Sequence, residues 1–170
     1  MAGKPSGAPT AAAPPFRPLE QYSQTELVQL LRSLLDALPD RVFVKDLHGR
    51  YVVDSLQHRR FVGVDTHTDI TGRTSRDFFD DSVAAAFAVD DQDVADGGSI
   101  VGKKEQVAGV RDTPRWIETS KVALRGPRGD AAHVLGVSRD ITREVRTEQR
   151  SLDRREPFAK LFGAERTYAE

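Results

Sequence analysis

Residues 41–54 read Arg-Val-Phe-Val-Lys-Asp-Leu-His-Gly-Arg-Tyr-Val-Val-Asp, and this stretch decides the fold. Its two halves, Arg41 to Asp46 and Arg50 to Asp54, are rich in β-branched and aromatic residues, which favour strands. Between them, Asp46-Leu47-His48-Gly49 is typical of a tight turn, in which Gly49 can adopt positive φ. The stretch therefore predicts a β-hairpin.

Downstream of the hairpin, the sequence predicts helices first and strands afterwards. Ser55 to Val62 has the pattern of a short helix, and Asp80 to Asp96 that of a longer helix. Three strand candidates follow: Ile100 to Val110, Pro114 to Arg125 and Ala132 to Ile141. Two strands, then helices, then three strands predict an α+β fold, in which an antiparallel sheet carries helices on one face.

Upstream of the hairpin, an amphipathic helix is expected to follow a disordered leader. Residues 1–18 are rich in Pro, Ala and Gly, and they bury too little apolar surface to offset the entropy of ordering. In residues 19–38, Ser23 and Glu26 have the spacing of a capping box. Leucines follow at heptad spacing, at Leu27, Leu31, Leu34 and Leu38. This stripe suits packing on its own domain as well as a dimer interface, and the sequence favours neither.

The last segment, residues 142–170, predicts a charged helix that Pro157 interrupts. Like charges occupy separate i,i+4 rows, which are Asp140, Glu144 and Glu148 in one and Arg146, Arg150 and Arg154 in the other. Such rows weaken an isolated helix but suit a partner helix of complementary charge. The chain is thus expected to divide into a leader, a helix, a central domain over residues 39–141 and this tail.

Composition excludes several classes of protein. The 170 residues include no cysteine, which removes disulfides, iron–sulfur clusters, Cys-ligated zinc and thiol nucleophiles. A formal net charge of −1 gives no overall attraction to nucleic acid or to an anionic membrane, so neither is an expected partner. No apolar run reaches the ~20 residues needed to span a bilayer, and the start lacks a signal-peptide pattern. We therefore expect a cytoplasmic protein.

Three stretches resemble the PAS family, above all the PAS domains of bacterial sensor kinases and cyclases. They are Leu35 to Tyr51, then Ile70-Thr71-Gly72-Arg73-Thr74 followed by Asp77-Phe78-Phe79, and finally Gly136 to Arg143 with its Asp140-Ile141-Thr142 exit motif. They cover residues 36–143 in the family's order. The resemblance implies a five-stranded antiparallel sheet under a helical clamp. It also implies a role in signal detection, dimerisation and control of an output domain.

In this family the space between sheet and helices can hold a ligand. Strand alternation places Val134, Gly136 and Ser138 on one face, which by resemblance turns toward the helices. The expected pocket residues are Phe43, Phe61, Phe78, Phe87, Trp116, Val134, Gly136 and Ser138. Ordinary core packing is the favoured interpretation of this set; in a ligand site, Ser138 would be the polar handle. Lys45 shares the face of Phe43, where it could pair with an anion, although long side chains more often extend to water.

The resemblance also argues against a resident chromophore. Flavin photosensors of the family need a cysteine near residues 73–79, together with Asn and Gln; the chain has neither Cys nor Asn, and Ser138 aligns where Gln should be. Haem-binding relatives use a histidine on the long helix, and residues 80–96 contain none. We expect no cofactor, and the small-molecule ligand stays unknown. No metal site is expected either, because the four histidines lack ligand spacing. The acidic cluster of residues 80–96 predicts a solvated helix face.

The sequence thus predicts a sensory or interaction module rather than an enzyme. It is expected to form a homodimer through the leucine stripe and to act on an output domain or partner protein. Asp140 and Thr142 lie where the last strand becomes a helix, and the resemblance implies that strain in the sheet passes there to the exit helix; a plain helix cap is compatible with this. Two alternatives stay open. One is a ligand-free dimerisation domain with a filled core, and the other is a small α+β enzyme, which needs a histidine and a carboxylate in one pocket.

Overall fold

The computed structural model describes residues 17–108 and 114–162. Its helices and strands follow in this order: α1 (Gln24–Ala37), β1 (Arg41–Asp46), β2 (Tyr51–Asp54), α2 (Leu56–Val62), α3 (Asp81–Ala95), β3 (Ile100–Ala108), β4 (Pro114–Arg125), β5 (Ala131–Asp140) and α4 (Thr142–Phe162). Short 3₁₀ turns occupy Leu19–Gln21 and Ser75–Asp77. The predicted leader lies outside the described residues except for its last two positions. The predicted order of strands and helices is confirmed.

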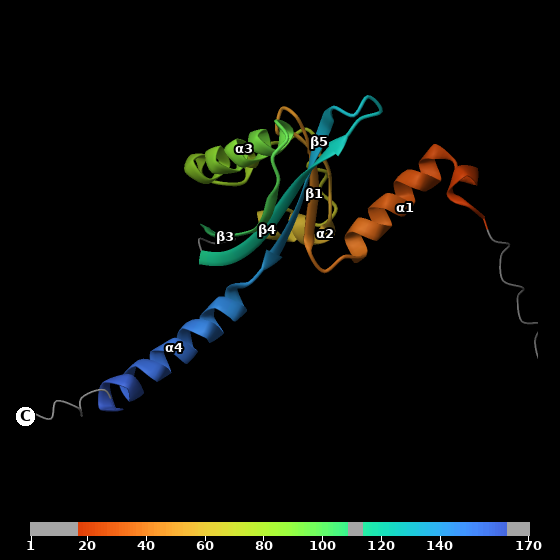
Figure 1. The fold of residues 1–170 in the computed structure, drawn as a ribbon. Helices are drawn as coiled ribbons and strands as arrows, with labels where there is room; N and C mark the ends of the chain where they lie inside the picture. Colours follow the sequence, from red (N-terminus) through yellow and green to blue (C-terminus); the bar gives the residue numbers. More distant parts are fainter. Residues whose placement is uncertain (1–16, 109–113, 163–170) are drawn as a thin grey trace, which may run out of the picture.

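A single five-stranded antiparallel sheet forms the base of the fold (Figure 1), with the strand order β2-β1-β5-β4-β3. The first two strands form the predicted hairpin. Gly49 has a φ of 77°, and its N–H donates to the carbonyl of Asp46 over 3.0 Å. The Asp46 carboxylate also accepts from the backbone N–H groups of His48 and Arg50, at 2.9 Å each. These bonds hold the turn that the sequence predicts, and the α+β fold class is confirmed.

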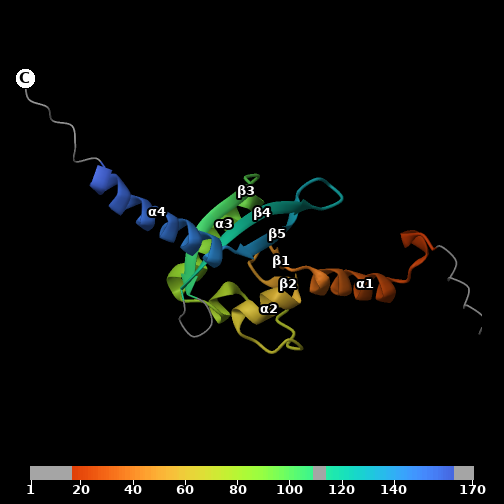
Figure 2. The same ribbon diagram turned by 90° about the horizontal axis from the view of Figure 1, so that it is seen from below.

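The helices α2 and α3 cover one face of the sheet (Figure 2). Along β5 the buried residues alternate as predicted, with Val134, Gly136 and Ser138 turned inward. The core below α2 centres on Phe43, Tyr51 and Ile70. Glycine is required at position 136 because the ring of Phe43 lies directly over it, where any Cβ would collide with the ring. The sheet and the two helices therefore enclose the interior from opposite sides.

Helices α1 and α4 extend away from the sheet in different directions (Figure 1). The start of α1 has the predicted capping box: Ser23 N–H donates to Glu26 Oε2 over 2.8 Å, and Glu26 N–H donates to Ser23 Oγ over 3.3 Å. Leu35 is its only buried residue. Near its end, Asp36 Oδ1 accepts from Leu56 N–H and from Arg59 Nη2, at 2.7 Å each, which attaches α1 to α2.

The exit helix differs from the sequence prediction. We expected Pro157 to interrupt it, but α4 runs from Thr142 to Phe162 and includes that residue. A proline inside a helix removes one backbone hydrogen bond without obliging the chain to leave helical geometry. Among the described helices, none combines the length and the apolar character that crossing a membrane requires.

Both edges of the sheet are modified. At the β2 edge, Tyr51 N–H donates to Arg73 O, and Tyr51 O accepts from Gly72 N–H, at 2.8 Å each, so a loop covers the start of this strand. At the β3 edge, the pairing with β4 is irregular between Ile100 and Lys103. Gly102 stands there with a φ of 61°, and its N–H donates to Ser120 Oγ over 3.0 Å. The strand β2 is thus partly covered, and the regular part of β3 is limited to residues 103–108.

Candidate functional site

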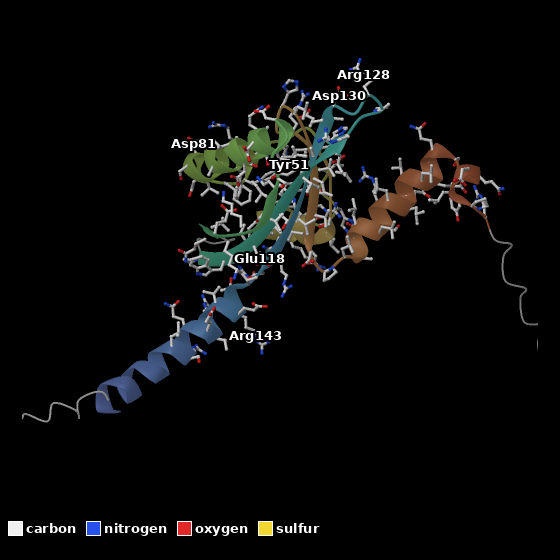
Figure 3. The ribbon with its side chains drawn as sticks, in the orientation of Figure 1. Tyr51, Asp81, Glu118, Arg128, Asp130 and Arg143 are labelled. Carbon is white, nitrogen blue, oxygen red and sulfur yellow. The ribbon has the colours of Figure 1, made fainter. Side chains whose placement is uncertain are left out.

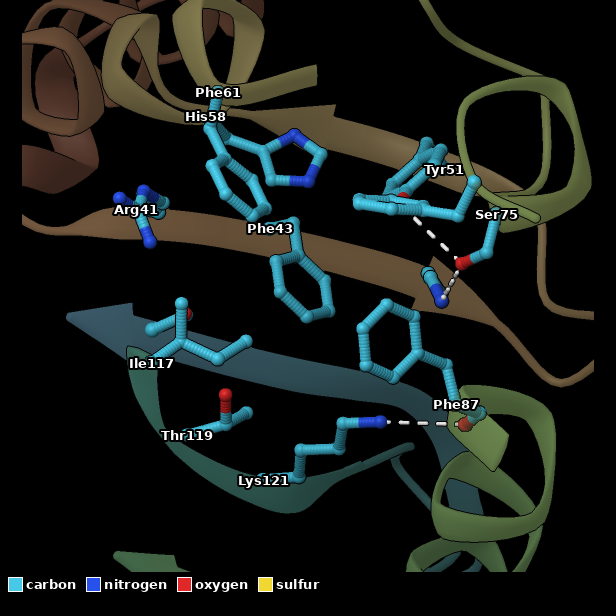
Figure 4. A pocket seen from close by; sticks show the side chains of 13 residues that line it. Arg41, Phe43, Tyr51, His58, Phe61, Ser75, Phe87, Ile117, Thr119 and Lys121 are labelled. Carbon is cyan, nitrogen blue, oxygen red and sulfur yellow. Dashed lines mark hydrogen bonds between the residues drawn. The ribbon is translucent and has the colours of Figure 1, made fainter. Parts of the chain in front are cut away.

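A small cavity lies between the sheet and the helices (Figure 4). Its volume is about 20 Å³, which is room for about one water molecule. The residues that line it come from four strands, the two helices and the segment between them: Arg41, Phe43, Lys45, Tyr51, His58, Phe61, Ser75, Phe79, Phe87, Ile117, Thr119, Lys121 and Ser138. The interior is thus nearly filled by its own side chains.

Four of the eight predicted pocket residues line this cavity: Phe43, Phe61, Phe87 and Ser138. Gly136 and Val134 also face the helices, but they do not line the cavity. Gly136 is covered by the Phe43 ring, and Val134 lines a neighbouring surface pocket beside Leu47.

Phe78 and Trp116 lie elsewhere, and both are corrections. Phe78 packs on the core cluster, with its ring centroid 6.0 Å from that of Tyr51. Trp116 is on the opposite face of β4, because the inward residues of that strand are Ile117, Thr119 and Lys121. An alternating strand cannot present both Trp116 and Ile117 to one side.

Three phenylalanines form a row on the helix side of the cavity. The ring of Phe61 in α2 lies 5.8 Å from that of Phe79, and the ring of Phe79 lies 5.3 Å from that of Phe87 in α3. All three rings are only half-buried. Phe61 also packs on Arg41, whose guanidinium carbon is 4.0 Å from the ring centroid. These three half-buried rings form the wall of the cavity on the side of α2 and α3.

At one end of the cavity, two buried lysines share one carboxylate. Lys45 Nζ lies 2.7 Å from Asp91 Oδ2, and Lys121 Nζ lies 2.6 Å from Asp91 Oδ1. Each lysine is 2% exposed, and Asp91 is 8% exposed. Lys45 also donates to Ser75 Oγ over 2.8 Å. Burial lowers the pKa of Lys45, whereas the nearby Asp91 carboxylate acts to raise it. Lys45 therefore does not extend to water, contrary to the usual behaviour of a lysine.

Asp91 also corrects the prediction of a solvated acidic face on α3. Its neighbour Asp90 pairs with Lys103 over 2.7 Å, so both residues are engaged by the sheet. The sequence did hold a signal, since Phe87, Asp91 and Val94 are spaced four and three residues apart and so share one helix face. A carboxylate within an apolar stripe needs a buried cation, and the inward positions of β1 and β4 supply two.

A histidine and a carboxylate also meet beside the cavity. His58 Nδ1 lies 3.4 Å from Asp54 Oδ2, and the two residues are 3% and 8% exposed. The imidazole packs between the rings of Phe43 and Tyr51, with centroids 5.1 and 5.0 Å away. Burial lowers the pKa of His58, although Asp54 acts in the other direction. Among the described residues, the only hydrogen-bond partner of its ring is Asp54.

At the other end of the cavity, one carboxylate joins two strands to the exit helix. Asp140 Oδ2 accepts from Arg41 Nη2 over 3.0 Å and from Arg115 Nη1 over 2.9 Å. Its other oxygen accepts from the backbone N–H of Thr142, the first residue of α4, over 3.0 Å. Partial burial acts to raise the pKa of Asp140, but the hydrogen bonds from Thr142 and Arg115 and the charge of Arg41 lower it to about 2.

Thr142 completes this junction. Its Oγ1 accepts from Trp116 N–H over 2.9 Å, and Trp116 O accepts from Ile141 N–H, also over 2.9 Å. Trp116 is therefore bound through its backbone to the start of α4. We call Arg41, Arg115, Asp140 and Thr142 the exit junction. Among the described residues, no group of three metal-ligating side chains is placed to hold a metal ion.

These features define a class of protein: a small α+β domain in which helices close a cavity over an antiparallel sheet and the last strand continues into a projecting helix. The family model for the PAS fold matches residues 35–146. The chain therefore belongs to the PAS-fold family, as its three motifs predicted. PAS domains commonly serve as sensory parts of signalling proteins.

One curated relative is the methanogenesis regulatory histidine kinase FilI of Methanothrix harundinacea, which is 30% identical over 127 residues. The match covers 73% of this chain but only 14% of the kinase. The chain thus corresponds to a small part of that protein.

Solved structures agree with the fold. The PAS domain of Bordetella pertussis BvgS has a TM-score of 0.59 at 18% identity, covering 78% of this chain and 98% of that one. A PAS domain from Colwellia psychrerythraea has a TM-score of 0.56 at 17% identity, with coverages of 69% and 98%. VqmA bound to DPO has a TM-score of 0.60 at 23% identity, and the match covers 68% of this chain and 57% of VqmA.

Proposed function

We propose that this chain is a non-catalytic regulatory input module, in which a small molecule in the buried cavity acts on the exit helix. One observation carries the proposal: Arg41 lines the cavity and, through its Nη2, binds the carboxylate that caps α4. A ligand that moves Arg41 alters the bonds of Asp140, and through them the start of α4. The bound state of VqmA, a protein of similar fold, supports a ligand-binding role.

The proposal includes self-association through α1. Its four predicted dimer leucines are 39–57% exposed, at Leu27, Leu31, Leu34 and Leu38. A helix with such a stripe gains free energy by burying it against a second copy. We propose that two chains pair along α1 and that α4 leads to an output domain or a partner protein, as in a kinase of the FilI kind.

The proposal includes neither catalysis nor a resident chromophore. His58 and Asp54 are the histidine and carboxylate that the enzyme alternative needs, but they lie 3.4 Å apart. The imidazole is enclosed by Phe43 and Tyr51 and has no hydrogen-bonded nucleophile among the described residues. The chain contains no cysteine for a flavin adduct, and the sequence of α3 contains no histidine for haem. A net charge of −1 favours a protein partner over nucleic acid.

A double-mutant cycle tests the relay. Phe87→Ala changes the cavity wall, Asp140→Asn weakens the junction, and amide hydrogen exchange reports the opening free energy of Thr142 to Val145 in the full chain. We expect Phe87→Ala to change that free energy in the wild-type background and not in the Asp140→Asn background, with a coupling above about 0.5 kcal/mol. Val89→Ala, on the same helix with 69% exposure, is the control. Additive effects of the two changes would reject the relay.

Light scattering tests the dimer. Leu31→Glu combined with Leu34→Glu places charges on the exposed stripe and should convert the dimer into a monomer. Gln29→Glu changes an exposed residue of the same helix outside the leucine stripe and should leave the mass unchanged. A wild-type chain that stays monomeric at high micromolar concentration would contradict this part of the proposal.

A further inference from the structure

Three neighbouring side chains at one end of the cavity carry polar atoms that lack a partner. Arg41 in β1 is paired with Ser138 in β5, and Ser138 is paired with Thr119 in β4. All three line the cavity. Arg41 Nη1, Ser138 Oγ and Thr119 Oγ1 are buried without a hydrogen-bond partner among the described residues. Buried polar atoms in proteins are nearly always hydrogen-bonded, so three adjacent exceptions indicate a missing partner.

The chemistry of these atoms restricts that partner. A guanidinium N–H can only donate, whereas the two hydroxyl groups can donate or accept. A group that satisfies all three at once must therefore present an acceptor to Arg41, and acceptor oxygens can serve the two hydroxyl groups as well. A carboxylate fits best, because it has two acceptor oxygens and makes short, charge-assisted bonds with a guanidinium. Ser138 and Thr119 are 5% and 3% exposed, so bulk water does not compete for them.

The rest of the lining suits an organic anion with an apolar body. The charged residues that line the cavity are Arg41, Lys45 and Lys121, and no carboxylate lines it. The two lysines are already held by Asp91, which leaves Arg41 as the cation with a free donor. Ile117, Phe43 and Phe61 lie on the Arg41 side of the cavity, and Phe87 lies at its far side, as Figure 4 shows. An apolar group would contact these side chains while its charged end meets Arg41.

The size of the cavity sets a further condition. About 20 Å³ accommodates no organic molecule unless a ring moves. Phe61 is the ring to move, because it is half-buried, comes from the short helix α2 and stacks on Arg41. Movement of the Phe61 ring widens the cavity next to Arg41 Nη1, Ser138 Oγ and Thr119 Oγ1. The same movement releases a guanidinium that also holds Asp140 of the exit junction.

We propose that the cavity takes a small organic monocarboxylate with an apolar body, whose carboxylate binds Arg41, Ser138 and Thr119. This inference rests on the proposed sensory function and names the class of its ligand. A neutral ligand with a lone carbonyl oxygen and an ordered water alone are the competing occupants, and the experiment separates them.

The test compares acids with their uncharged amides on the full chain. The probes are isovalerate against isovaleramide and phenylacetate against phenylacetamide, titrated by calorimetry and by the emission of Trp116, the single tryptophan of the chain. We expect one acid at least to bind, and its amide to bind at least tenfold more weakly. Arg41→Gln should weaken acid binding at least tenfold, Arg41→Lys should weaken it less, and Thr119→Val should weaken it several-fold. Arg60→Gln removes an exposed charge from α2 and should change affinity less than twofold.

The outcomes separate this inference from the function on which it rests. Equal affinity for acid and amide overturns the carboxylate class, and so does acid binding that Arg41→Gln and Thr119→Val leave intact. Because a closed cavity could hide binding, Phe87→Ala, which removes one ring of the phenylalanine row, is titrated as well. If no acid binds to this variant or to the wild type, the inference is wrong: binding of an amide then indicates a neutral ligand, and binding of neither probe indicates an ordered water. If the double-mutant cycle shows coupling between Phe87 and Asp140 but no acid binds, the carboxylate inference fails and the proposed relay from the cavity to α4 stands. Acids that bind without changing exchange at the start of α4 overturn the relay instead.

Discussion

Two aspartates in this fold each bind two cationic side chains, and they lie at opposite ends of the inward row of β1. At Asp91 the partners are Lys45 and Lys121, and the three side chains are 2–10% exposed. At Asp140 the partners are Arg41 and Arg115, and the three side chains are 11–45% exposed. Figure 3 shows the side chains on the surrounding elements. The number of charges is the same, but the access to water differs.

This difference assigns separate roles to the two ends. Breaking a buried ion pair leaves an uncompensated charge away from water, so the Asp91 cluster fixes α3 on the sheet. A partly hydrated ion pair contributes little and exchanges its partners at small cost. The exit junction is therefore the end whose ion pairs rearrange at the smaller cost, as the proposed relay requires. Arginine suits it, because one guanidinium can bind Asp140 with one nitrogen and face the cavity with another.

The largest expected effect comes from removing the buried carboxylate. Asp91→Ala leaves the buried Lys45 without a carboxylate partner and Lys121 with only Asp90, 3.8 Å away, and should lower the free energy of unfolding by about 3–5 kcal/mol. Urea denaturation measures it. Asp140→Ala should cost about 1 kcal/mol, because its partners can turn to water. Similar losses in the two variants would erase the proposed distinction.

Two further variants control the Asp91 result. Asp93→Asn changes an exposed carboxylate of the same helix and should alter stability by less than about 0.5 kcal/mol. Lys45→Met, Asp91→Leu and Lys121→Met combined replace the whole cluster by apolar side chains. This triple variant should recover most of the loss, because buried ion pairs are often replaceable as a unit.

A smaller effect is expected in the middle of the inward face, between the two ends. Gly136→Ala places a Cβ against the Phe43 ring, which must move, and overpacking of this kind should cost about 1–3 kcal/mol in thermal or urea unfolding. Gly126→Ala is the matched control, because a Cβ there meets its neighbours at ordinary contact distances of 3.5 Å or more. Equal costs at the two glycines would mean that Phe43 does not fill the space over β5.

The buried His58 and the exit junction should also differ in pH dependence. Burial holds the pKa of His58 below its usual 6.5, so the unfolded chain takes up a proton there before the native chain does. The contribution of neutral His58 to the free energy of unfolding is then fully present above about pH 6.5. It declines on acidification by up to about 1.4 kcal/mol per pH unit. The pKa of Asp140 is lowered from 3.8 to about 2, so the stability it contributes is lost only as the pH falls through that range.

Urea unfolding between pH 7.5 and 5.0 measures this slope. His58→Gln should flatten it, and Asp140→Ala should leave it unchanged over the same interval. A slope that persists in His58→Gln would show that another group is responsible.

The smallest effect is the response to salt. Raising NaCl to 1 M shortens the Debye length to about 3 Å and screens exposed ion pairs much more than buried ones. The cost of Asp140→Ala should therefore fall by a few tenths of a kcal/mol, whereas the cost of Asp91→Ala should stay constant. Equal salt sensitivity in the two variants would contradict the difference in hydration.

Local chemistry made much of the fold predictable. The hairpin at residues 41–54 and the capping boxes at Ser23 and Thr74 depend on residues within a few positions of one another. In Thr74 the backbone N–H and the hydroxyl both donate to Asp77, at 2.7 and 3.0 Å. Alternation alone grouped Val134, Gly136 and Ser138 on one face of β5, and the PAS resemblance supplied the side to which that face turns. Such features need no knowledge of distant contacts.

The site was less predictable, because it depends on registers between distant strands. The face that Trp116 occupies follows from the pairing of Thr119 with Ser138, and an irregularity between Leu124 and Arg125 near the turn shifts that register. Asp91 joins β1, β4 and α3, and a sequence does not reveal that two lysines will be buried beside it. The sequence revealed the exit motif, but not the hydrogen bond from Arg41 to Asp140, because these two residues are 99 positions apart in the sequence.

The modified edges of the sheet have a consequence for how copies of this chain can associate. Regular exposed strand edges invite another chain to extend the sheet, which is a route to fibrous aggregates. Here residues 72–73 of a loop form backbone hydrogen bonds with β2 at one edge of the sheet. At the other edge, the positive φ of Gly102 interrupts the regular geometry of β3, and two lysines follow it. Addition of a strand is thereby discouraged along the covered start of β2 and at the irregular start of β3.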